Sequence, residues 1–68
     1  MKPLTAREME RLVRSHGWVE NTRDGSHRNF KKPGVEALIT IPFHKGKTLP
    51  TGLQLAIMKI AGISKEAL

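Results

Sequence analysis

Residues 18–31, WVENTRDGSHRNFK, contain the strongest indication of the fold of this chain. Asp24-Gly25 near the centre of the stretch is a two-residue hairpin signal, because both residue types are common in tight antiparallel turns. The signal predicts a first strand over residues 18–23, which turns back on a second strand over residues 26–31. An antiparallel hairpin is therefore the centre of the expected fold.

Side chains along the second strand should alternate between the two faces of the sheet. His27, Asn29 and Lys31 then share one face, and Phe30 marks the other, buried face. Trp18 and Phe30 are expected in the core, because a chain with so few large aromatic residues needs them to fill its interior. His27 is expected to point outward, where a polyanion can reach it. The alternative is an ordinary solvent-facing histidine.

The residues before the hairpin predict a helix over residues 6–16. Thr5 and Glu8 form a capping box, and Gly17 suits the left-handed conformation that ends many helices. Apolar residues recur there with helical spacing, so one face of the helix should be buried. The residues expected on that face are Met9, Leu12, Val13 and His16.

The residues after the hairpin predict a third strand and a second helix. Residues 37–41 are the most β-prone run of the chain and are closed by Pro42. A helix should follow over residues 51–61 and end at Gly62, and residues 64–68 can form a short terminal turn. The residues expected on the buried face of the second helix are Leu53, Ala56, Ile57, Ile60 and Ala61.

The order α-β-β-β-α indicates an α+β fold with a three-stranded antiparallel sheet. Two amphipathic helices can bury their apolar faces only if both lie on one face of the sheet and leave the other face to solvent. Double-stranded-RNA-binding domains have this architecture. We expect residues 1–68 to form a single domain, because a chain of this size buries only about 60% of its surface on folding.

Charge and composition indicate the class of partner. Twelve Lys and Arg residues against six Asp and Glu residues give a net charge of +6, which attracts polyanions such as nucleic acids. A basic surface without such a role is the alternative. The chain has no cysteine, no long apolar run and no signal-peptide pattern near its N-terminus, so we expect a cytoplasmic protein with no membrane partner.

Most classes of active site lack their sequence pattern here. The carboxylates are scattered and no His, Asp or Glu cluster has metal-ligand spacing, so we expect no metal. The glycines are isolated turn and cap residues rather than a phosphate loop, and no small-molecule cofactor is expected. His44-Lys45-Gly46-Lys47 forms a basic loop that can meet phosphates, with a solvated loop as the alternative.

Three motifs together resemble the HicA family of bacterial mRNA interferase toxins. They are Gly25-Ser26-His27, then Ile41-Pro42 followed by His44-Lys45-Gly46-Lys47, and Ala61-Gly62-Ile63-Ser64. The resemblance covers nearly the whole chain. It implies an endoribonuclease that cleaves mRNA in the bacterial cytoplasm, with a double-stranded-RNA-binding-like fold and a HicB antitoxin that covers the active site.

The resemblance places the catalytic histidine of the family at His27. Without a metal site, an RNase can use the 2′-hydroxyl of its substrate as nucleophile, while an imidazole moves a proton and cations stabilise the phosphorane. The complementary acid is His44, a lysine or water. The candidate phosphate contacts are Arg28, Lys31, His44, Lys45 and Lys47.

Two residues beside His27 bear on this interpretation. Arg28 should emerge on the opposite face from His27 unless a bulge at Ser26, or the strand's edge, reorients it. Asn29 departs from the family, which often has an apolar residue at this position. The alternative functions are a noncatalytic basic RNA-binding module and a small structural protein whose charge mediates assembly.

Overall fold

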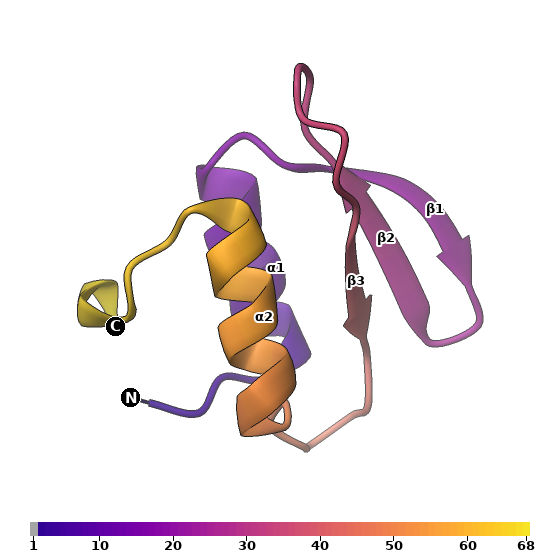
Figure 1. The fold of residues 1–68 in the computed structure, drawn as a ribbon. Helices are drawn as coiled ribbons and strands as arrows, with labels where there is room; N and C mark the ends of the chain where they lie inside the picture. The colour runs from indigo at the N-terminus through magenta and orange to yellow at the C-terminus, as the bar shows by residue number, and fades with distance from the viewer. Residues whose placement is uncertain (1) are drawn as a thin grey trace.

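The computed structural model describes residues 2–68 and has the predicted element order (Figure 1). Two α-helices enclose three strands in the sequence, and a single 3₁₀ turn follows the second helix. The elements are α1 (Ala6–Ser15), β1 (Val19–Asp24), β2 (His27–Lys31), β3 (Ile39–Pro42), α2 (Thr51–Ala61) and η1 (Lys65–Ala67). The predicted bounds of the second helix are reproduced, and the other elements differ by one to two residues at an end.

Helix α1 begins where its local sequence predicts. The Thr5 hydroxyl accepts the Glu8 N–H at 3.2 Å, and the Glu8 carboxylate accepts the Thr5 N–H at 2.9 Å, which completes the capping box. The helix ends with His16 as its C-cap, followed by Gly17 at φ +92°. His16, expected on the apolar face, is exposed because it already lies beyond the last helical turn.

The three strands form one antiparallel sheet in the order β1-β2-β3. A bulge interrupts the β1–β2 ladder between Glu20, which pairs with Phe30, and Thr22, which pairs with Asn29. The extra residue in β1 shifts its alternation, so Glu20 and Thr22 face opposite sides of the sheet. Strand β3 runs over Ile39–Pro42 rather than residues 37–41, because its pairing with β2 begins at Ile39. Pro42 is tolerated since β3 is an edge strand.

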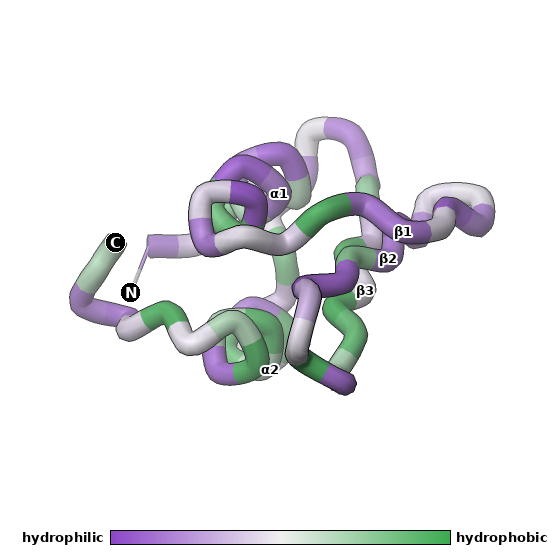
Figure 2. Tube along the Cα trace, turned by 90° about the horizontal axis from the view of Figure 1, so that it is seen from above, coloured by the Kyte–Doolittle hydropathy of each residue, from purple (hydrophilic) through white to green (hydrophobic). Residues whose placement is uncertain are grey.

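Both helices pack on one face of the sheet, as the burial argument requires, and the other face is open to solvent (Figures 1 and 2). Figure 2 shows α1 and α2 side by side on that face. Trp18 and Phe30 are buried in the core as predicted. The other buried apolar residues are Leu4, Ala6, Met9, Val13, Ile39, Ile41, Leu49, Ile57, Met58 and Ile63.

The buried face of α2 differs from the predicted one. Ala56 is exposed and Ile60 is 41% exposed, whereas Gln54 and Met58 are buried beside Ile57. A buried amide is stable only when its polar atoms are bonded, and both ends of the Gln54 side chain have partners. The prediction considered only the spacing of apolar residues and therefore left Gln54 out of the core. As a result, the predicted buried face is rotated about the helix axis relative to the observed one.

Gln54 attaches the N-terminal segment to α2. Its Oε1 accepts the Leu4 N–H at 2.8 Å, and its Nε2 donates to the Lys2 carbonyl at 2.7 Å. The Leu4 carbonyl in turn accepts the Leu49 N–H at 2.7 Å. These bonds hold the start of α1 beside the loop over residues 43–50, which is the arrangement that forms the site described below.

Within residues 2–68, no helix combines the length and the apolar character needed to cross a lipid bilayer.

Candidate functional site

The β1–β2 turn places His27 at the end of the sheet. Asp24 pairs with His27, so Gly25 and Ser26 are the two turn residues. Of these two turn residues only Gly25 has a positive φ, at +59°, as expected of a hairpin with glycine at its first turn position. The turn thus lies one residue later than the predicted Asp24-Gly25, because Asp24 completes the ladder of β1 instead of turning.

The outer face of the sheet carries His27, Asn29 and Lys31, as the alternation predicts. His27 and Lys31 are exposed. Asn29 is half-buried, donates to the Thr22 hydroxyl at 2.9 Å and accepts from the Thr40 hydroxyl at 2.6 Å. The polar Asn29 is therefore accommodated by hydrogen bonds to both neighbouring strands, in the place where an apolar residue would pack.

Arg28 lies on the opposite face of β2, between the sheet and α1. Its Cζ is 3.9 Å from the centroid of the Phe43 ring, and its Nη1 is 3.8 Å from Oε1 of Glu10 on α1. No bulge at Ser26 turns it outward, since the bulge of this sheet lies in β1. Arg28 and His27 are therefore separated by the thickness of the sheet.

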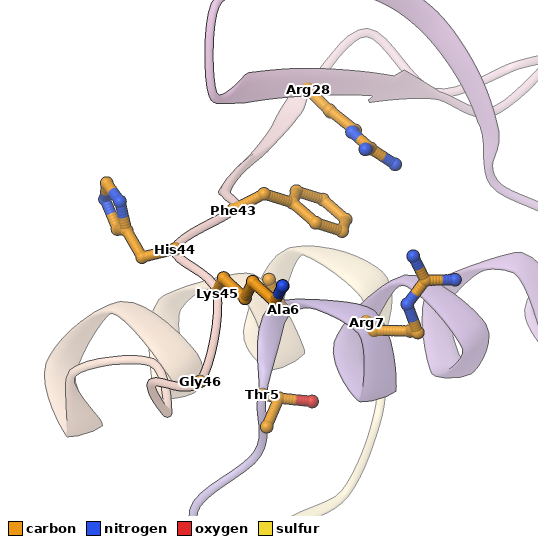
Figure 3. A pocket seen from close by; sticks show the side chains of 8 residues that line it. All are labelled: Thr5, Ala6, Arg7, Arg28, Phe43, His44, Lys45 and Gly46. Carbon is orange, nitrogen blue, oxygen red and sulfur yellow. The ribbon is translucent and has the colours of Figure 1, made fainter.

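A pocket of about 500 Å³ opens beside Arg28, where the start of α1 meets the loop after β3. Figure 3 shows Arg7 rising from α1 toward Arg28 and Phe43, with Lys45 near the start of the helix. The His44 imidazole borders the pocket but points away from Phe43 (Figure 3). The lining residues are Thr5, Ala6, Arg7, Arg28, Phe43, His44, Lys45 and Gly46.

The structure thus brings together three of the predicted RNA contacts, Arg28, His44 and Lys45, around one pocket. Lys47 is exposed on the same loop, outside the pocket lining. Lys31 lies at the far end of β2, four residues from His27, which corresponds to about 13 Å along a strand. The basic residues therefore form a cluster at one end of the sheet, and Lys31 stands apart from it.

Two other arginines, Arg14 and Arg23, are paired with carboxylates. Glu10 binds Arg14 at 3.0 Å, and Glu20 accepts two hydrogen bonds from Arg23, at 2.9 and 3.1 Å. The Arg23 guanidinium lowers the pKa of the Glu20 carboxyl below its ordinary value, and Glu20 raises the pKa of Arg23. Within residues 2–68, neither Arg7 nor Lys45 forms an ion pair, so both keep their charge available to a ligand.

Arg7 and Phe43 line the pocket although no sequence pattern indicated them as site residues. A cation at the second position of a helix is unfavourable, because the helix dipole makes that end positive, and this misplaced charge is the signal that could have identified Arg7. Phe43 carried no comparable signal, since its role depends on the guanidinium of a distant strand. Only the tertiary structure brings the two residues together.

Groups of three or more His, Asp or Glu side chains that could hold a metal ion are absent from the described part of the chain, residues 2–68.

Comparison with known proteins assigns the chain to a family. Residues 6–63 match the family model described as the HicA toxin of bacterial toxin–antitoxin systems. The match covers all three strands and both α-helices. No curated protein matches the chain. Because the match spans most of the sequence, including His27 and the pocket residues from α1, β2 and the loop after β3, the chain belongs to the HicA toxin family of bacterial toxin–antitoxin systems.

Proposed function

We propose that this toxin is an endoribonuclease that cleaves mRNA without a metal ion, with His27 as its proton-transfer group. The observation that carries the proposal is the place of His27 in a HicA-family chain. Its imidazole is exposed on the sheet face that no helix covers, at the end where the basic residues cluster. A single-stranded RNA can therefore reach it without any rearrangement of the core.

The chemistry needs no nucleophile from the protein. The 2′-oxygen of the RNA attacks the adjacent phosphorus, the bond from phosphorus to the 5′-oxygen of the next nucleotide breaks, and a 2′,3′-cyclic phosphate and a 5′-hydroxyl end are formed. His27 is proposed to take the 2′-hydroxyl proton or to protonate the leaving 5′-oxygen. Nearby cations are proposed to stabilise the negative phosphorane.

His44 is the complementary acid or base that the strand pairing favours over a lysine or water. His27 faces Pro42, and the Phe43 N–H donates to the Ser26 carbonyl at 2.7 Å. His44 therefore lies two residues beyond the residue opposite His27. Because β3 ends at Pro42, His44 stands at the start of the following loop, at the same end of the sheet as His27.

All but one of the remaining RNA contacts are proposed at the same end of the molecule. Lys45 and Lys47 follow His44 in the loop, and Arg28 reaches the pocket on the inner face. Lys31 is proposed to contact a more distant part of the RNA, because it lies at the other end of β2. Phosphate contacts of this kind fix the position of the RNA without reading its sequence.

The test compares His27→Ala with His16→Ala, which removes a second exposed histidine beyond the end of α1. Purified protein is incubated with single-stranded RNA in EDTA. His27→Ala should lower the cleavage rate by about 10²–10⁴-fold, whereas His16→Ala should cleave at the native rate. Products should carry 2′,3′-cyclic phosphate and 5′-hydroxyl ends, and a 2′-deoxy nucleotide at the cleavage position should block the reaction.

Two outcomes would contradict this proposal. If a folded His27→Ala variant still cleaves RNA at the native rate, His27 is not the proton-transfer group. If the native protein binds RNA with a steep salt dependence but never cleaves it, with or without EDTA, the protein is a noncatalytic RNA-binding module, which its net charge of +6 also favours.

Membership of the family implies an antitoxin partner. We propose that this partner is a HicB-type protein that covers His27 and the basic loop. The histidine reagent diethyl pyrocarbonate should modify the exposed His27 in the free toxin, and addition of a HicB-type antitoxin should prevent that modification while His16 still reacts. Equal modification of His27 in the free toxin and in the complex would show that the antitoxin binds elsewhere.

A further inference from the structure

We propose that the pocket between α1 and the sheet binds an RNA phosphate that neighbours the one cleaved at His27. The inference rests on the proposed ribonuclease function and adds a substrate subsite on the inner face of the sheet. It gives Arg7 and Phe43 roles that no sequence motif indicated.

Cations from three different elements converge on this pocket. Arg7 comes from the first turn of α1, Arg28 from β2 and Lys45 from the loop after β3. The nearby acids are already engaged, since Glu8 accepts the Thr5 N–H at 2.9 Å and Glu10 binds Arg14 at 3.0 Å. The pocket therefore carries a net positive charge, and its ligand should be an anion.

Arg28 is held in a fixed orientation before any ligand binds. Its guanidinium stacks on the Phe43 ring at 3.9 Å, and its ion pair with Glu10 is long, at 3.8 Å. A guanidinium presents its N–H donors in one plane, which matches two oxygens of a phosphate. Stacking fixes this plane and leaves N–H groups available, so less side-chain entropy is lost when a phosphate binds.

Two effects favour an anion beside Arg7, the charge of its guanidinium and the positive end of the helix dipole. It lies at the second position of α1, where the helix dipole repels a cation and attracts an anion. A bound phosphate would be stabilised both by the Arg7 guanidinium and by the positive end of the helix. The same phosphate would relieve the repulsion between Arg7 and the dipole.

The location of the pocket makes RNA the ligand rather than an acidic protein segment. His27 and Arg28 are consecutive in β2, so the outer-face imidazole and the inner-face pocket lie on either side of one strand end. An RNA chain passing around this end would present one phosphate to His27 and the next to the pocket. The pocket volume of about 500 Å³ lies within the range of about 300–1,000 Å³ found for pockets that hold small organic groups.

The test measures RNA binding without cleavage. A short single-stranded RNA with 2′-O-methyl riboses is titrated into the full chain, and binding is followed by fluorescence anisotropy at several salt concentrations. Arg7→Ala removes one charge without breaking an ion pair within residues 2–68, and Lys59→Ala, in the last turn of α2, is the charge-matched control. Arg28→Lys keeps the charge but loses the planar donor set.

Arg7→Ala should weaken RNA binding about tenfold relative to Lys59→Ala, the loss expected of one charge-assisted hydrogen bond. Its slope of log affinity against log salt should fall by about 0.7, the value for one phosphate of a single strand. Arg28→Lys should also bind more weakly than Lys59→Ala. In ¹H–¹⁵N spectra, the RNA should shift the amides of residues 5–7 and 43–46.

Equal affinities and slopes for Arg7→Ala and Lys59→Ala would overturn the subsite. Shifts of these amides by a polyglutamate peptide, but not by the RNA, would also overturn it and would assign the pocket to a protein partner. The test is independent of catalysis. Weakened binding with a native protein that never cleaves RNA would refute the ribonuclease alone, and unchanged binding with normal cleavage would refute the subsite alone.

Discussion

His27 and Arg28 are adjacent in β2 but lie on opposite faces of the sheet. His27 is exposed beside Asp24 and Pro42, whereas Arg28 is half-buried against Phe43 and Glu10. This separation gives the two residues different physical roles, since one can meet a ligand freely and the other also takes part in packing. Substitutions of the two neighbours should therefore have distinct effects on stability.

Arg28→Ala should lower the free energy of unfolding by about 1 kcal/mol, because it removes a cation–π contact and a weak ion pair. His27→Ala should change it by no more than about 0.5 kcal/mol, as is usual for an exposed side chain. Urea unfolding followed by circular dichroism measures both values. Equal losses for the two variants would show that the Arg28–Phe43 stack adds nothing to stability.

Asn29 should stabilise the outer face through its two hydroxyl partners. Asn29→Ala removes both hydrogen bonds and should cost about 1 kcal/mol of unfolding free energy. A double-mutant cycle with Thr40→Ala should show that the two losses are not additive, because they share one bond. Lys31→Ala, an exposed change on the same strand, is the control. Additive effects of Asn29 and Thr40 would indicate that solvent replaces their bond without loss.

Gln54 should be the polar residue on which the fold depends most. Gln54→Ala leaves the Leu4 N–H and the Lys2 carbonyl without partners and opens a cavity, so the unfolding free energy should fall by about 2–4 kcal/mol. Leu55→Ala is the control on the same helix, because Leu55 is 43% exposed and should cost less than about 1 kcal/mol. Thermal unfolding measures both. A smaller loss for Gln54→Ala than for Leu55→Ala would contradict the anchoring role of Gln54.

The Glu20–Arg23 pair should make stability depend on pH. Arg23 lowers the folded-state pKa of Glu20, so the contribution of the pair is complete above the ordinary carboxyl pKa of about 4.3 and is lost as the pH falls through the lower folded-state value. Glu20→Gln should therefore be less stable than the native chain at neutral pH, and the difference should shrink as acid protonates Glu20.

Urea midpoints of the native chain and Glu20→Gln across this pH range test the prediction. Glu36→Gln is the control, because Glu36 is exposed and forms no ion pair within residues 2–68. Because the pair is solvent-exposed, added salt should also reduce the difference at neutral pH. A difference that grows toward acid would reverse the sign and contradict the pairing seen here.

Features that depend on neighbouring residues could be predicted from the sequence. The capping box of Thr5 and Glu8 started α1, Gly62 ended α2 at the predicted residue, and strand alternation placed His27 outward. Each of these features is governed by backbone preferences or side-chain bonds within a few residues, which a local pattern records. The hairpin was predicted by the same kind of signal, with its turn one residue early.

Contacts between residues far apart in the sequence follow only from the packing of the folded chain. Gln54 became a core residue because Leu4, fifty positions earlier, supplies its hydrogen-bond partner, and the apolar spacing of α2 held no record of that bond. The pocket likewise required Arg7, Arg28 and Lys45 to converge from a helix, a strand and a loop. Such contacts arise from how the elements pack, and packing depends on shape and bonding across the whole core rather than on any single stretch of sequence.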